Sequence, residues 1–150
     1  MKGRTGFVGK NKHDIEILKE IHKNAAMCVD ALNLLEPTVS REEIKNSIRE
    51  QIGTLSGIEK HARQQIEARG EVPRPAETRL GLWISTRGQG TDNESAGSLA
   101  RMLVEGNTDG ITDLTNALES CPQADESLKE TARKLLDAEQ KSIDTISSFM

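Results

Sequence analysis

Residues 18–35, LKEIHKNAAMCVDALNLL, repeat apolar side chains at alternating steps of three and four. The repeat consists of Leu18, Ile21, Ala25, Cys28, Leu32 and Leu35. An average spacing of about 3.5 residues keeps one stripe of an α-helix facing its neighbours, so the stripe can be buried along its whole length. The stretch therefore predicts a helix that packs lengthwise against other helices.

Three further stretches carry the same pattern, and the second and third are far apart in the chain. We expect four helices with one long crossover between the second and the third, and the crossover has room for a short extra helix. The helices are predicted at about residues 12–36, 41–69, 92–120 and 123–148, and the crossover at residues 70–91. Helices paired two and two around one long connection form an all-α four-helix bundle. Residues 11–150 form this bundle in our prediction. Residues 1–10 contain glycines and basic side chains without periodicity, which predicts a flexible basic tail.

Local signals set the predicted ends of the helices. Asn11 with Asp14, and Ser40 with Glu43, match the reciprocal capping box of a helix N-terminus. Gly70 suits the left-handed residue that ends a helix. Because the connection before Ser40 is short, we expect the first two helices to be antiparallel neighbours. The long crossover predicts that the second and third helices run parallel.

The composition excludes several classes of function. The net charge is −4, and Lys and Arg are spread along the predicted helices, so no broad basic face is available for nucleic acid. One Trp, two Phe and no Tyr leave few rings to stack on bases. No apolar run approaches the ~18 residues of a membrane span, and the N-terminus lacks the apolar centre of a signal peptide. We expect a cytoplasmic protein that binds no nucleic acid.

The two cysteines are expected to remain thiols. Cys28 lies in the middle of the first helix, and Cys121 lies in the turn before the last helix. A rise of 1.5 Å per residue places Cys28 roughly 20 Å from either end of the bundle. A disulfide needs Cα atoms within ~7 Å, so the two residues should not pair. Cys28 is expected to be a small core residue rather than a reactive thiol.

Large apolar residues gather in the predicted crossover, namely Leu80, Leu82, Trp83 and Ile84. Side chains of this size in a linker need to be covered. In one interpretation this crossover patch packs over an edge of its own bundle. In the other, the patch is an exposed docking surface for a protein partner or for a second copy of the chain.

Polar residues fall on or beside the apolar seams near the middle of the bundle. Glu139 and Gln51 occupy seam positions of the fourth and second helices, and Glu59 and His22 lie beside their own seams. A buried carboxylate has to be hydrogen-bonded, protonated or paired. We expect a polar layer that sets the helix register, with Gln51 donating to Glu139. The alternatives are a pocket for a small ligand or a single metal ion, and a Glu139 that tilts into solvent.

Two glycines lie four residues apart inside the predicted third helix. Gly106 and Gly110 each cost about 1 kcal/mol relative to alanine. On the inward side of the helix they allow another backbone or a bulky side chain to approach closely, and a local kink is the competing explanation. We therefore include both glycines in the candidate layer.

Two segments resemble an uncharacterised group of ferritin-like bacterial proteins from anaerobic firmicutes: EIHKN at residues 20–24 and MLVEGNTDGI at residues 102–111. The resemblance covers about residues 12–150 and implies a ferritin-like bundle without an assigned activity. Metal-binding ferritin-like bundles use a Glu-x-x-His pair on each of two helices. No histidine here follows a glutamate at that spacing, and the predicted third and fourth helices contain no histidine. We therefore expect no di-iron or di-manganese site.

The sequence favours a non-enzymatic helical bundle that acts as a scaffold or interaction protein, with no cofactor and no metal. It contains no nucleophile elbow, phosphate loop, paired Cys-x-x-Cys or His-Glu-x-x-His motif. The alternative is an atypical metal- or small-ligand-binding ferritin-like protein that uses Glu59, Glu139 and His22. A third hypothesis is a sequestering oligomer similar to ferritin-like cages.

Overall fold

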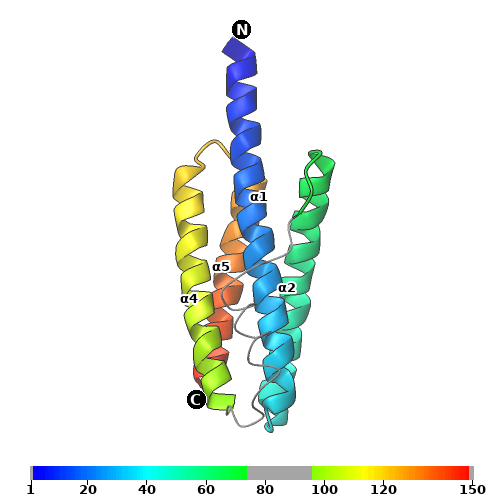
Figure 1. Ribbon diagram of the computed structural model, residues 1–150, viewed down its shortest axis with the longest axis vertical. Helices are drawn as coiled ribbons and strands as arrows, with labels where there is room; N and C mark the ends of the chain where they lie inside the picture. Colours follow the sequence, from blue (N-terminus) through cyan, green and yellow to red (C-terminus); the bar gives the residue numbers. More distant parts are fainter. Residues whose placement is uncertain (1, 74–95, 149–150) are drawn as a thin grey trace.

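The computed structural model describes residues 2–73 and 96–148 (Figure 1). This part of the chain forms four α-helices and a short 3-10 helix, and it contains no strand. The elements are α1 (Lys2–Leu35), η1 (Glu36–Thr38), α2 (Glu42–Ala68), α4 (Ala96–Ser120) and α5 (Glu126–Ser147). The predicted all-α four-helix bundle is confirmed. In the described residues, no helix has both the length and the apolar character needed to cross a membrane.

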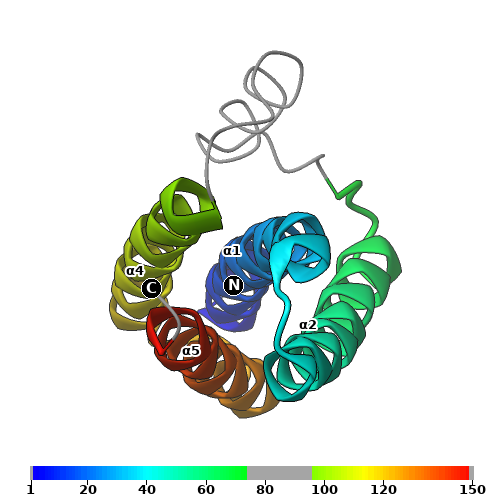
Figure 2. The same cartoon turned by 90° about the horizontal axis from the view of Figure 1, so that it is seen from below.

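The helices lie side by side along one long axis, as the views along and across that axis show (Figures 1 and 2). Helix α1 packs most extensively against α2, and α4 packs most extensively against α5. Helix α1 also contacts α4 and α5, so it touches each of the other three helices. The short connection through η1 makes α1 and α2 antiparallel neighbours, as predicted.

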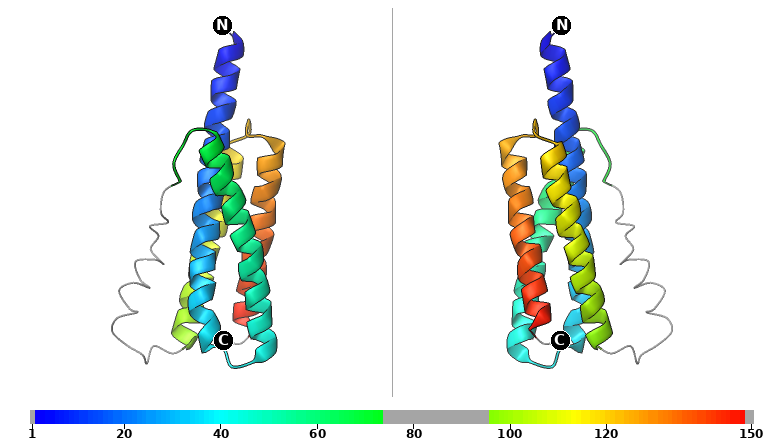
Figure 3. Two further views of the ribbon diagram at one scale, coloured as in Figure 1. Left: turned by 90° about the vertical axis from the view of Figure 1, so that its right-hand side faces the viewer. Right: turned by 90° about the vertical axis from the view of Figure 1, so that its left-hand side faces the viewer.

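Helices α2 and α4 run in the same direction (Figure 3). Helix α2 ends at one end of the bundle and α4 begins near the other, which confirms the predicted crossover between parallel helices. The crossover patch, the possible extra helix and the predicted start of the third helix near residue 92 lie outside the described residues.

The predicted boundary near Asn11 is wrong, because α1 extends back to Lys2 and projects beyond the bundle (Figure 1). A helix that the bundle has already nucleated gains one hydrogen bond for each residue added, so it can continue past the last tertiary contact. The capping box predicted at Asn11 is therefore absent. Its partner Asp14 is buried, at 6% exposure, and has a different task, described below.

The start of α2 also differs from the prediction. Its N-cap is Arg41, and no side chain makes a capping hydrogen bond there. The side chain of Glu43 pairs with Arg41, so it does not reach back to Ser40. At the other end of α2, Gly70 has a positive φ of 79°, which confirms the predicted left-handed stop.

The core consists of the facing stripes of the four helices, and α1 contributes a fully buried seam. The buried seam of α4 consists of Ala100, Leu103, Asn107, Gly110 and Leu114. Gly106 is only half-buried. Asn107 occupies the seam position beside it, so only Gly110 of the two predicted glycines lies in the buried seam.

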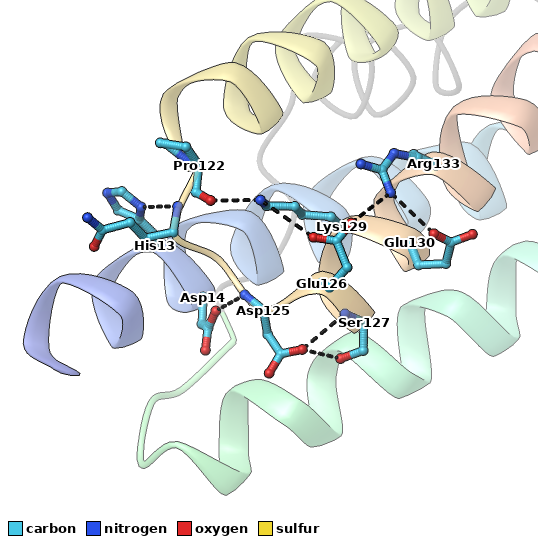
Figure 4. Close-up of polar contacts among 10 residues, drawn as sticks. His13, Asp14, Pro122, Asp125, Glu126, Ser127, Lys129, Glu130 and Arg133 are labelled. Atoms are coloured by element: carbon cyan, nitrogen blue, oxygen red, sulfur yellow. Dashed lines mark hydrogen bonds and ion pairs between the residues drawn. The ribbon is translucent and has the colours of Figure 1, made fainter. Parts of the chain in front are cut away.

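Polar groups of α1 anchor the turn between α4 and α5 (Figure 4). The backbone N–H of Asp125 donates to Asp14 Oδ1 at 2.6 Å, and the N–H of Gln123 donates to His13 Nδ1 at 3.1 Å. Arg69, at the end of α2, lies 3.6 Å from Asp14 Oδ2. Asp125 in turn accepts the N–H of Ser127, which caps α5. Asp14 therefore ties the ends of three helices together.

The thiol of Cys121 lies in the same turn. It donates to Glu16 Oε2 at 3.2 Å. Burial, and then the hydrogen bond to Glu16, raise the pKa of Cys121 to about 11. Cys121 and Cys28 are both free and buried thiols, and Cys121 remains protonated at neutral pH.

We expect Asp14→Leu to lower the free energy of unfolding by about 1–3 kcal/mol, because it leaves the N–H of Asp125 without its acceptor. Asp14→Asn keeps an acceptor oxygen and should cost less. Glu119→Ala, at an exposed site near the end of α4, is the control and should change stability by less than about 0.5 kcal/mol. Urea unfolding followed by circular dichroism measures all three, and equal stability of the two Asp14 variants would contradict the anchoring role.

Candidate functional site

A buried polar layer interrupts the apolar core where α1, α4 and α5 meet. Its members are Asn24 and Cys28 of α1, Asn107 and Gly110 of α4, and Glu139 of α5. Asn24 and Glu139 are completely buried, at 0% exposure. The heptad spacing places them inside, because Asn24 lies between Ile21 and Cys28 on the α1 seam. Burial of this many polar groups requires that they satisfy one another.

The Cys28 thiol is the centre of the layer. Its Sγ lies 2.9 Å from Asn107 Oδ1 and 3.3 Å from Glu139 Oε1. A thiol has one proton, so it donates to one of these oxygens at a time. Burial raises the pKa of Cys28 well above its usual value, and Glu139 raises it further. Cys28 is therefore a neutral hydrogen-bond donor and a poor nucleophile, as the sequence predicts.

Gly110 provides the space for this arrangement. A Cβ at this position would lie 2.3 Å from Asn24 Oδ1 and 2.8 Å from Glu139 Oε1, which is closer than real Cβ atoms approach. The two side chains therefore pack directly onto the α4 backbone. This is the close approach that the glycines predict, and it occurs at Gly110.

Two oxygens of the layer have no hydrogen-bond partner among the described residues: Asn24 Oδ1 and Glu139 Oε2. The amide nitrogen of Asn24 is already used, since Nδ2 donates to Glu20 O at 2.9 Å and to Glu20 Oε1 at 3.0 Å. Both unpartnered atoms belong to side chains that meet over Gly110. A buried acceptor without a donor lowers the stability of the fold by about 1–3 kcal/mol. A hydrogen-bond donor at this position would remove that cost.

The surroundings of Glu139 favour its neutral form. Burial raises the pKa of Glu139 to about 7, from an ordinary value of 4.5. The hydrogen bond from Cys28 lowers this pKa, and the negative charges of Glu20 and Asp113 raise it. The inward position of Glu139 is confirmed.

Gln51 does not donate to Glu139, so that predicted contact is wrong. The Nε2 of Gln51 donates to Thr145 Oγ1 at 2.8 Å and to Ser47 Oγ at 3.1 Å, while its Oε1 accepts from Ser142 Oγ at 2.8 Å. Glu139 instead contacts residues of α1 and α4. Each residue of an α-helix turns the side-chain direction by about 100°, so Ser142 points about 60° away from Glu139. That difference is enough for the two side chains to face different helices.

His22 and Glu59 form a third polar group, between α1 and α2. His22 Nε2 lies 2.9 Å from Glu59 Oε1, and Arg63 Nη1 lies 3.9 Å from the same oxygen. Glu139 takes no part in this pair. Among the described residues, no three His, Cys, Asp or Glu side chains gather as the ligands of a metal ion would. The set of Glu59, Glu139 and His22 considered from the sequence is therefore not assembled.

Sequence reasoning missed Asn24 and Asn107 as members of the layer. Both lie at steps of three or four from apolar seam residues, Asn24 between Ile21 and Cys28, and Asn107 four residues after Leu103. That spacing was the available signal. It was overlooked because asparagine is usually exposed, whereas here each amide faces a polar group of another helix.

Comparisons of the chain with family models, with curated proteins and with solved structures produced no match.

We expect Gly110→Ala to lower the free energy of unfolding by about 1–3 kcal/mol, because the new methyl group forces Asn24 and Glu139 off the α4 backbone. Gly57→Ala is the matched control. Nothing lies within 4 Å of its Cβ position on α2, so helix propensity alone should stabilise the protein by about 0.5–1 kcal/mol. Thermal melts measure both, and a stabilising Gly110→Ala would show that the close approach does not exist.

A double-mutant cycle tests the corrected partners of Gln51. Gln51→Leu and Ser142→Ala should couple by about 0.5 kcal/mol or more, because their side chains share a hydrogen bond. Gln51→Leu and Glu139→Gln should add to within about 0.5 kcal/mol, since these residues have no bond in common. Denaturant unfolding gives both cycles. The reverse pattern would restore the contact expected from the sequence.

Proposed function

We propose that this protein is a non-enzymatic helical bundle that acts as a scaffold or interaction protein, with no cofactor. The complete burial of Glu139 carries this proposal. The most reactive group types of the interior, a thiol and a carboxyl, bind one another and are closed off from solvent. A substrate cannot reach them without opening the bundle.

The solvent-facing surface supports an interaction role. A groove of about 410 Å³ lies between α2 and α5, with Ile58 and Ala138 among its apolar residues. Charged side chains line the same groove, including Glu50, Lys134 and Lys141. An apolar centre with a polar, solvent-accessible rim is the arrangement found in protein–protein interfaces.

The chain also carries the crossover patch of Leu80, Leu82, Trp83 and Ile84. We propose that a protein partner or a second copy of the chain covers this patch, because four large apolar side chains in water would forgo several kcal/mol at ~25 cal/mol per Å². The proposal includes a cytoplasmic location and no nucleic-acid partner, consistent with the net charge of −4. The single connection between parallel helices also supports a ferritin-like bundle.

Trp83, the one tryptophan of the chain, tests the proposal by fluorescence. Its emission in the native protein should be blue-shifted and protected from acrylamide. If a second copy covers the patch, protection should fall on dilution, and Leu82→Ser should reduce both the protection and the sedimenting mass. A red-shifted, freely quenched emission of the native protein at every concentration would contradict this prediction.

Metal analysis of the same preparation separates the scaffold from the metal-binding alternative. We expect less than one equivalent of iron, manganese or zinc per chain after mild purification. Two equivalents with a carboxylate-bridged spectrum would overturn the proposal.

A further inference from the structure

We propose that the folded bundle holds one proton between Glu139 and Asn24, above Gly110, and that the loss of this proton loosens the contact of α5 with α1 and α4. The position is a proton-controlled lock, built from a neutral carboxyl group that donates to Asn24 Oδ1. The lock works whether or not the protein binds a partner.

The first step of the argument is the geometry over Gly110. Asn24 Oδ1 and Glu139 Oε1 both lie close to the position that a Cβ of residue 110 would occupy. Their distances from that position are 2.3 and 2.8 Å. Both residues are at 0% exposure. An amide oxygen and an ionised carboxylate are both pure acceptors, so they repel each other when buried together. A proton on the carboxyl converts this repulsion into a hydrogen bond.

The second step is the supply of donors. The Asn24 amide N–H groups are used by Glu20, and the Cys28 thiol is directed at Asn107 Oδ1 and Glu139 Oε1. The two atoms left over are both acceptors, Asn24 Oδ1 and Glu139 Oε2. A hydrogen on the Glu139 carboxyl that is directed at Asn24 Oδ1 gives this oxygen a donor and removes the negative charge of Glu139.

The third step is the charge around the site. Helix α1 presents Glu20 and Lys23, and α4 presents Asp113, with Lys23 Nζ at 2.8 Å from Glu20 Oε1 and 3.8 Å from Asp113 Oδ2. Helix α2 places Glu59 in its pair with His22 and turns the uncharged Gln51 toward α5. Lys23 is thus engaged by two other carboxylates. An ionised Glu139 would add a further negative charge to this group.

The direction of the pH effect follows from linkage. Glu139 has a pKa of about 7 in the folded bundle and an ordinary value of 4.5, which we take for the unfolded chain. Between these values the folded state binds more protons than the unfolded state, so stability falls as the pH rises. The contribution is fully present below 4.5 and is lost above 7. Over that window, Glu139 alone should raise the unfolding constant by on the order of a hundredfold.

The experiment compares the wild type with Glu139→Gln, which carries a neutral amide that can donate to Asn24 without titrating. The ratio of their unfolding constants, from urea titrations between pH 4 and pH 8, isolates the contribution of Glu139. We expect the wild-type constant to rise on the order of a hundredfold relative to the variant as the pH increases. Asp137→Asn, at an exposed site on the same helix, is the matched control and should give a ratio that changes less than threefold.

A ratio that stays flat, or that falls with pH, overturns the proposal. A second measurement does not depend on the stability of a variant: the ¹³C carboxyl resonance or the infrared carbonyl band of Glu139 in the folded wild type. At pH 6 it should show a neutral acid. An ionised carboxylate at that pH would show that the two oxygens hold water or a cation instead of a proton, and it would overturn the proposal. A titration of Glu139 that equimolar manganese or zinc abolishes would point to a cation and would overturn the proposal as well.

Discussion

The seam of α1 is the element around which the other helices are arranged. This helix contacts each of the other three, and its polar residues lie at two levels along its length. At one end of the bundle, Asp14 receives the turn between α4 and α5 and the end of α2. In the middle, Asn24 and Cys28 meet Gly110, Asn107 and Glu139. Apolar stripes alone allow helices to slide past one another by a turn, whereas polar contacts at two separate levels permit one register.

The buried polar layer defines the register of the helices at a cost in stability. Removal of a carboxyl from water costs several kcal/mol if it remains charged, and the Cys28 thiol is a weak donor. A leucine at position 139 would avoid that cost. The carboxyl fits here because Gly110 leaves space for it and the Cys28 thiol lies within hydrogen-bond distance, so a shifted helix would lose both. The same requirements make the layer sensitive to protonation.

Periodicity predicted the architecture well, because it depends on many residues at once. The bundle, the antiparallel pair, the crossover between parallel helices and the inward position of Glu139 all follow from steps of three and four. The same periodicity did not predict which polar side chains contact one another within the layer. Gln51 and Glu139 are near each other in level, yet a rotation of one side chain around α5 decides whether it faces α2 or α1. A seam pattern predicts the buried face of a helix, but it does not predict toward which neighbouring helix each side chain on that face points.

Residue types also misled where the context changed their role. Asp14 and Glu43 have the spacing of capping residues, but neither one caps its helix. Asp14 accepts the N–H of Asp125 from another part of the fold, and Glu43 pairs with the neighbouring Arg41. Asn107 shows the reverse case: it is a residue typical of surfaces, and here it is buried with its side-chain oxygen facing the Cys28 thiol. Local rules of capping and exposure describe a helix by itself. At Asp14 and Asn107 these rules fail because another part of the fold offers a partner, and both positions are buried contacts between elements.

The charges of the buried polar layer explain why it favours a proton over a metal ion. In helical bundles that bind metals, several carboxylates and histidines converge, and the positive ion balances their charge. Here Glu139 converges with a thiol and two amides, while the nearby carboxylates Glu20 and Asp113 are balanced by Lys23. Two amide oxygens and a neutral thiol add no negative charge that would attract a divalent ion. One proton is enough to neutralise the layer, and the pH at which it leaves then becomes a property of the whole helix packing.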